Sequence, residues 1–150
     1  MSDHIFAAYG VGLNRTEMAK YCPTAKSIGV TELKNFRLAF RGGKACAVVT
    51  IEKAKGGSVP ALLWEITTQD EAALDRLIGS PELYRKDTVK VRCNGTTVEA
   101  FSYTLLGGKP LNRPSAFYYS TLLEGYKAAG FDTEILKVAV QGESADKPTA

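Results

Sequence analysis

Five consecutive residues near the start of the chain, Tyr9-Gly10-Val11-Gly12-Leu13, have the composition of a ligand-binding loop. Glycine adopts backbone conformations closed to other residues and lets a ligand approach the main chain. Asn14 is a good N-cap, and Glu17 three residues later can complete a capping box, so the loop leads into a helix. Main-chain N–H groups at the start of a helix suit a carboxylate or phosphate oxygen. A tight turn that binds nothing is an equally good interpretation of the two glycines.

Composition argues against several other kinds of chemistry. The 150 residues carry a net charge of +3 with no dense basic run, which disfavours nucleic acid as a partner. One histidine, His4, and three widely spaced cysteines make no metal-binding pattern, so we expect no metal. Arg15 occupies the place of the third glycine of a dinucleotide-binding fingerprint, so we expect no cofactor either.

Cysteine usage and hydropathy also predict where the protein works. The cysteine count is odd and no signal peptide is recognisable, which favours a reducing, cytoplasmic setting. No apolar run approaches the ~20 residues that a membrane helix needs, so we expect no membrane partner. The length fits a single domain, which we place at residues 1–141, followed by a polar C-terminal tail at 142–150.

The loop must be positioned by a sheet, because most of the chain has the pattern of strands. Apolar or alternating runs predict strands at 5–9, 28–40, 45–51, 59–66, 84–93 and 97–105. Glycine-rich turns are expected at 42–43 and 55–58, and a hairpin turn at Asn94-Gly95. Capping residues predict helices that begin near residues 14, 68, 115 and 132. Tight turns between strands, without regular strand–helix alternation, predict an α+β fold with a mainly antiparallel sheet.

Ordered blocks along the chain resemble the gamma-glutamylcyclotransferase-like family. The loop at 9–13 is similar to the family's Tyr-Gly-Ser-Asn-Leu signature, and Cys22-Pro23-Thr24-Ala25 is similar to a Cys-Pro-x-Ala segment of small bacterial members. Further matching blocks lie at 59–67, at 73–79 and at 114–118, the last similar to Pro-Ser-x-x-Tyr. The resemblance implies the family fold, a small closed or nearly closed β-barrel or sheet surrounded by helices.

The resemblance also implies a loss of activity. Active members convert a gamma-glutamyl amine or peptide into 5-oxoproline and the freed amine, and one carboxylate can move both protons that this reaction requires. The family's glutamate for this task aligns with Ile78, which has no proton to move. Val11 and Gly12 stand where the family has Ser and Asn. We therefore predict a pseudoenzyme.

Another carboxylate could take the place of the missing one, which leaves an active gamma-glutamylcyclotransferase as an alternative. Glu82 lies four residues after Ile78, beside the expected cavity, although an exposed loop glutamate is the favoured interpretation. Asp75 lies one helical turn before Ile78. Glu65 is within an apolar strand, and Glu124 is expected on the solvated face of the last long helix.

The remaining residues favour small-molecule binding over a protein-interaction module, the second alternative. Tyr118 matches a family tyrosine that hydrogen-bonds the ligand, and Tyr84 matches one that lines the cavity. The expected ligand is a small anionic metabolite, either a gamma-glutamyl compound or nucleotide-derived, which the protein could sequester. The candidate ligand-binding residues are Tyr9, Gly10, Val11, Gly12, Leu13, Ile78, Tyr84 and Tyr118.

Overall fold

One five-stranded sheet and four α-helices make up the part of the chain that the structure describes. This structure, a computed structural model, describes residues 4–80 and 82–146, without the side chains of Val11 and of residues 142–146. The elements in chain order are β1 (His4–Ala8), the short 3-10 helix η1 (Val11–Leu13), α1 (Arg15–Tyr21), β2 (Lys26–Arg41), β3 (Val48–Ile66), α2 (Thr68–Ile78), β4 (Tyr84–Cys93), β5 (Thr96–Leu105), α3 (Ala116–Ala129) and α4 (Glu134–Asp146).

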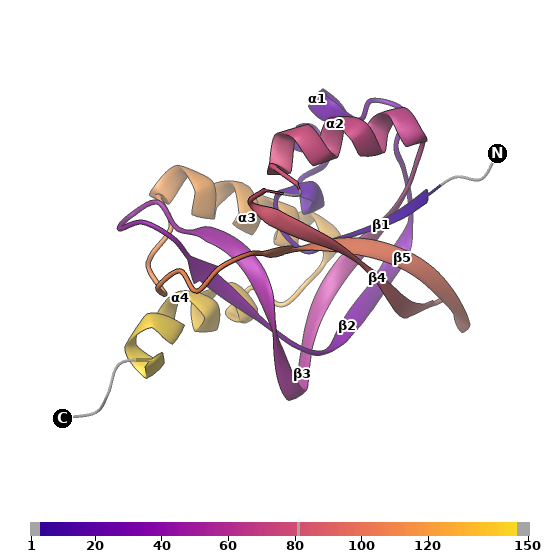
Figure 1. Cartoon of the computed structure of the whole chain (residues 1–150). Coiled ribbons are helices and arrows are strands. Elements are labelled where there is room, and N and C mark those ends of the chain that lie inside the picture. The colour runs from indigo at the N-terminus through magenta and orange to yellow at the C-terminus, as the bar shows by residue number, and fades with distance from the viewer. Residues whose placement is uncertain (1–3, 81, 147–150) are drawn as a thin grey trace.

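The sheet has the strand order β2-β3-β1-β5-β4. Neighbouring strands are antiparallel except for β1 and β5, which run parallel with Phe6 opposite Phe101. Helices α1 and α2 lie together at one side of the sheet, α3 lies behind it, and α4 lies beside β2 (Figure 1). The α+β class and the mainly antiparallel sheet are therefore confirmed.

The sheet is not closed into a barrel, which corrects the closed form of the expected closed or nearly closed barrel or sheet. Strands β2 and β4 are its two edges. The edges approach each other where the Thr31 hydroxyl donates a hydrogen bond to the Arg92 carbonyl at 2.6 Å and where Cys93 Sγ lies 3.9 Å from the Ile28 carbonyl oxygen. The twist of the strands thus curls the sheet without joining its edges by a ladder of main-chain hydrogen bonds.

The turn expected at 55–58 is also wrong, because β3 continues without a break from Val48 to Ile66. The pairing of β2 with β3 instead shifts register next to Asn35, which has a φ of 66°. Gly57 lies so close to β2 that a Cβ there would be 2.4 Å from the Phe36 carbonyl oxygen. The glycines therefore produce a bulge within one long hairpin, a role that glycine often has inside strands.

Helix α2 begins and ends as its capping residues predict. The Thr67 side chain accepts from the Asp70 N–H, and the Asp70 side chain accepts from the Thr67 N–H, which completes a capping box. Gly79 closes the helix with a left-handed φ of 86°. The last helix, α4, continues to Asp146, past the proposed boundary at 141, and the domain division itself stays a prediction. Residues 147–150 of the expected tail lie outside the described residues.

Helix α3 fixes the loop that precedes α1. Leu122 and Tyr126 of α3 and Leu13 of the loop are completely buried. A Cβ at Gly125 would lie 2.9 Å from the main-chain nitrogen of Asn14, so the helix and the loop touch backbone to backbone. The Asn14 amide adds hydrogen bonds to the Thr121 carbonyl at 3.2 Å and to the Glu124 carboxylate at 2.6 Å.

No helix among the described residues is long and apolar enough to span a membrane. Within the same part of the chain, no group of three or more His, Cys, Asp or Glu side chains could hold a metal ion.

Candidate functional site

A cavity of about 300 Å³ lies where α1, α2 and the 9–13 loop meet the sheet. Most of the side chains that line it are apolar or aromatic. Six of the eight candidate ligand-binding residues line it: Tyr9, Gly10, Gly12, Ile78, Tyr84 and Tyr118. Leu13 is fully buried in the core and is not part of the wall, and the Val11 side chain lies outside the described residues.

Several wall residues carry no motif that could have identified them. Tyr103 of β5 and Val48 and Val49 of β3 reach the cavity from parts of the chain far from the loop. Glu17 and Tyr21 of α1 also line it. Their spacing of four residues places both on one helix face, but only the tertiary structure shows that this face is turned to the cavity.

Main-chain atoms of Val49 bind two of the wall tyrosines. The Tyr84 hydroxyl donates to the Val49 carbonyl at 2.8 Å, and the Val49 N–H donates to the Tyr118 hydroxyl oxygen at 3.1 Å. The Tyr9 hydroxyl donates to the Tyr103 carbonyl at 2.6 Å. Burial raises the pKa of Tyr9, Tyr84 and Tyr118 above its ordinary value, so all three are neutral near pH 7.

The protein itself engages some of the N–H groups that we expected to face an anion. The Leu13 N–H donates to the Gly10 carbonyl at 2.9 Å, and Asn14 Oδ1 accepts from the N–H groups of Thr16 and Glu17. The N-cap at Asn14 is thereby confirmed. The Trp64 indole N–H donates to the Gly12 carbonyl at 2.9 Å, which anchors the loop to β3.

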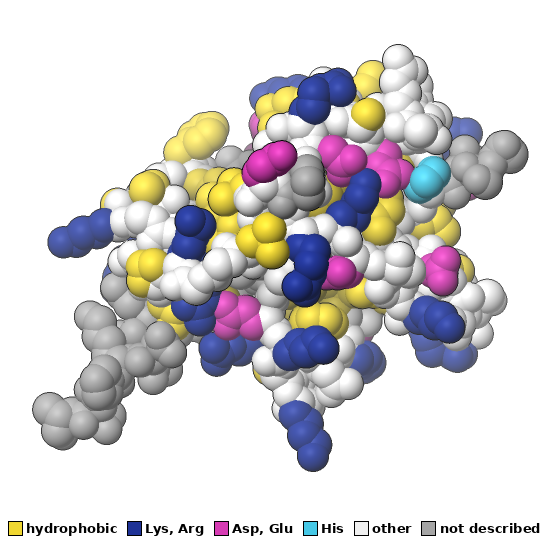
Figure 2. Space-filling model, in the orientation of Figure 1, with side chains coloured by type: hydrophobic (Ala, Val, Ile, Leu, Met, Phe, Trp, Pro, Cys, Tyr) yellow, Lys and Arg dark blue, Asp and Glu magenta, His cyan; other side chains and the backbone are white. Residues whose placement is uncertain are grey.

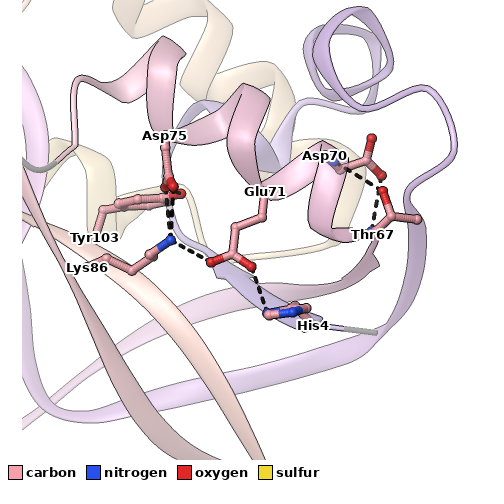
Figure 3. Close-up of polar contacts among 7 residues, drawn as sticks. All are labelled: His4, Thr67, Asp70, Glu71, Asp75, Lys86 and Tyr103. Atoms are coloured by element: carbon pink, nitrogen blue, oxygen red, sulfur yellow. Dashed lines mark hydrogen bonds and ion pairs between the residues drawn. The ribbon is translucent and has the colours of Figure 1, made fainter. Parts of the chain in front are cut away.

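An ionic network begins at the Tyr103 hydroxyl and lies on the side of α2 that faces the sheet (Figure 3). The Tyr103 hydroxyl donates to Asp75 Oδ1 at 2.7 Å, and Lys86 Nζ lies 3.0 Å from Asp75 Oδ2. Lys86 also pairs with Glu71, whose Oε1 lies 2.7 Å from His4 Nδ1. Figure 2 shows the acidic side chains of α2 beside the single histidine at the surface. The Asp75 carboxylate is thus bound by the Tyr103 hydroxyl and by Lys86, and Asp75 is not among the wall residues.

We expect Lys86→Met to lower the free energy of unfolding by about 1–3 kcal/mol, because it leaves Asp75 and Glu71 without their cation. The value stays below that of a fully buried pair because the Lys86 side chain is 29% exposed. Lys90→Met, an exposed position on the same strand, is the matched control. Urea unfolding of both variants at pH 7 measures the difference, and equal stability would show that the network contributes nothing.

Alkaline pH should remove the contribution of the Lys86 ion pairs to the free energy of unfolding. Burial by itself lowers the pKa of Lys86, but hydrogen bonds to Glu71 and Asp75 outweigh it and raise that pKa above its ordinary value. The stabilisation is therefore complete below the pKa of an unfolded-state lysine, ~10.4, and is lost as the pH rises through the higher folded-state value.

Of the carboxylates considered from the sequence, none lines the cavity. Glu82 is exposed to solvent. Glu65 of β3 lies opposite Ile5 of β1 in the sheet. The Glu124 carboxylate accepts a hydrogen bond from the Asn14 amide, outside the cavity. Glu17 is instead the charged residue in the wall as far as the structure describes it. Its Oε2 accepts from Lys20 Nζ at 2.9 Å.

The family model for gamma-glutamyl cyclotransferase, AIG2-like proteins matches residues 6–128, and the chain belongs to this family. Among solved structures, a gamma-glutamyl cyclotransferase has a TM-score of 0.80 at 23% identity, over 99% of this chain and 90% of its own. An uncharacterised protein from Homo sapiens gives the same values. YkqA from Bacillus subtilis has a TM-score of 0.79 at 16% identity, over 100% of this chain and 57% of its own. No curated protein sequence matches the chain.

Proposed function

We propose that this protein is a non-catalytic member of the family that binds a small molecule in the cavity and sequesters it. The observation that carries the proposal is the position of Ile78. It lies in the wall of the cavity, and the family resemblance gives the acid–base glutamate to this position. The site therefore has room for a ligand, but the side chain at the acid–base position is a hydrocarbon that cannot transfer a proton.

The size of the cavity supports binding over a protein-interaction role. Ligand pockets commonly have volumes of about 300–1,000 Å³ and are lined by apolar side chains with a few polar groups. The cavity of about 300 Å³, with its tyrosines, agrees with that description. A cavity without a function would gain stability by filling with larger side chains.

The first test is enzymatic. Purified protein is incubated with gamma-glutamyl amino acids, gamma-glutamyl amines and glutathione, and 5-oxoproline is measured. We expect no release above the protein-free background. Robust turnover that disappears in Glu17→Gln or Glu82→Gln would establish an active enzyme with a displaced carboxylate and overturn the proposal.

The second test is binding, measured as a thermal shift with a metabolite panel that includes gamma-glutamyl compounds and nucleotides. A ligand at ~100 times its Kd adds about 2.7 kcal/mol to the free energy of unfolding. Ile78→Trp fills the cavity and should abolish the shift, whereas Val138→Trp, at an exposed position of α4, should leave it unchanged. A shift that survives in Ile78→Trp would locate the binding site elsewhere.

A further inference from the structure

We propose that the natural ligand is a small amine with an apolar or aromatic body, bound with its ammonium group beside Glu17. This inference rests on the proposed function, because it names the class of molecule that the same cavity takes. It departs from the anionic ligand that the sequence suggested.

The charge in the wall is the first reason. Among the described residues that line the cavity, Glu17 carries a charge and no lysine or arginine is present. Arg15 points away, to the Trp64 ring and to the Ser27 hydroxyl, and Arg85 pairs with Asp87 on the surface. Among the wall residues, an anionic ligand would therefore meet a like charge and no cation of their own, since the nearest cation, Lys20, is already paired with Glu17, whereas an ammonium group would find an opposite charge.

The second reason is that most of the wall tyrosines have already donated their hydroxyl protons within the protein. The hydroxyl protons of Tyr9, Tyr84 and Tyr103 are donated to the Tyr103 carbonyl, the Val49 carbonyl and Asp75. A tyrosine that has given its proton can still accept a hydrogen bond through its oxygen. Of the four wall tyrosines with hydrogen-bonded hydroxyls, only Tyr118, which accepts from the Val49 N–H, keeps its own proton for a ligand. The Tyr84 hydroxyl oxygen and the Glu17 carboxylate thus match a ligand that donates.

The third reason is the apolar character of the mouth. Tyr21, Leu77 and Leu83 line the cavity and are also exposed to solvent, and hydrophobic side chains reach the surface near the start of β4 (Figure 2). Tyr21 lies one helical turn after Glu17 on the same face of α1, where its ring can contact both the apolar body and the ammonium group of a ligand.

Lys20 is the competitor for Glu17. Its ammonium group contacts Glu17 Oε2, but the Lys20 side chain is 58% exposed and lies toward solvent. A carboxylate accepts several hydrogen bonds, so a ligand can bind Glu17 together with Lys20 or in its place. Removing the Lys20 ammonium group should therefore strengthen the binding of an amine, whereas removing the Glu17 carboxylate should weaken it.

The experiment compares three probes of nearly equal size at pH 7: 2-phenylethylamine, 2-phenylethanol and 3-phenylpropanoate. We expect calorimetric titration to show the amine binding about tenfold more tightly than the alcohol, the difference between a charged and a neutral hydrogen bond. The carboxylate should bind most weakly. Glu17→Gln should remove the preference for the amine, Lys20→Met should increase it, and Glu82→Gln, which removes an exposed carboxylate outside the wall, should leave it unchanged.

The outcomes separate this inference from the proposed function. One outcome is that the alcohol or the carboxylate binds as tightly as the amine and that Ile78→Trp blocks this binding. It would overturn the amine inference and still support ligand binding in the cavity. Unchanged amine preference in both Glu17→Gln and Lys20→Met would also overturn it. Absence of binding by all three probes and by the metabolite panel would overturn both.

Discussion

Replacing Ile78 with glutamate will give the protein a rate of 5-oxoproline release at least about 100-fold above the wild-type background, the lower end of the ~10²–10⁴-fold effect of general acid–base catalysis. The side chain at this position is half-buried and lines the cavity at the end of α2. A carboxylate there can take the proton of an attacking amine and return it to the leaving nitrogen. Partial burial should also raise the pKa of the new carboxyl toward neutrality, which favours both roles.

Ile78→Gln is the control, because it has nearly the same shape and polarity but cannot transfer a proton. Release of 5-oxoproline is followed with gamma-glutamyl substrates under saturating conditions, with circular dichroism to confirm that both variants fold. Equal rates for the two variants, or no rate for either, would show that the missing carboxylate does not explain the loss of activity.

Restoring the family's asparagine at position 12 of the loop should be harder. A Cβ at Gly12 would lie 2.8 Å from the Ala8 Cβ and 3.2 Å from the Phe6 ring, so the asparagine of the family signature does not fit without a shift of β1. This crowding is why we place the expected gain at the lower end of the range.

Gly125→Val will lower the free energy of unfolding by about 3 kcal/mol, at the upper end of the usual cost of overpacking. Any Cβ at this position would lie 2.9 Å from main-chain atoms of both Leu13 and Asn14, and backbone cannot move aside as a flexible side chain can. A change of this size corresponds to a fall in Tm of roughly 6–12 °C for a domain of this length. The same variant should weaken ligand binding, because it displaces the loop from α3.

Ala128→Val on the exposed face of α3 is the matched control, since it introduces the same β-branched residue into the same helix. Its cost should be limited to the helix propensity of valine, below about 0.7 kcal/mol. Denaturant unfolding measures the free energy of unfolding of both variants. Equal stabilities would mean that the contact between α3 and the loop is looser than the structure indicates.

Local signals in the sequence predicted local structure well. Asn94-Gly95 forms the hairpin turn between β4 and β5 with positive φ values of 52° and 81°, as that dipeptide predicts. Asn14 and Thr67 cap the helices that follow them. In each case, neighbouring residues supply the hydrogen bonds or dihedral angles that determine the outcome.

Features that depend on distant partners could not be predicted in this way. Gly56-Gly57 looks like a turn in isolation and becomes a bulge because β2 pairs with β3 on both sides of it. Glu17 has the pattern of a capping residue, but its carboxylate binds Lys20 and lines the cavity. Tyr103 belongs to an ordinary strand pattern, and only the packing of α2 on the sheet brings it to the wall.

The chain contains a single tryptophan, and its position makes it a built-in optical reporter. Trp64 is 5% exposed, hydrogen-bonded to the Gly12 carbonyl and covered by the Arg15 guanidinium at 5.7 Å from the ring centroid. Indole fluorescence responds to both hydrogen bonding and nearby charge. Any movement of the loop that accompanies occupation of the cavity therefore changes the emission of one identified residue, so binding can be followed without a label or a catalytic assay.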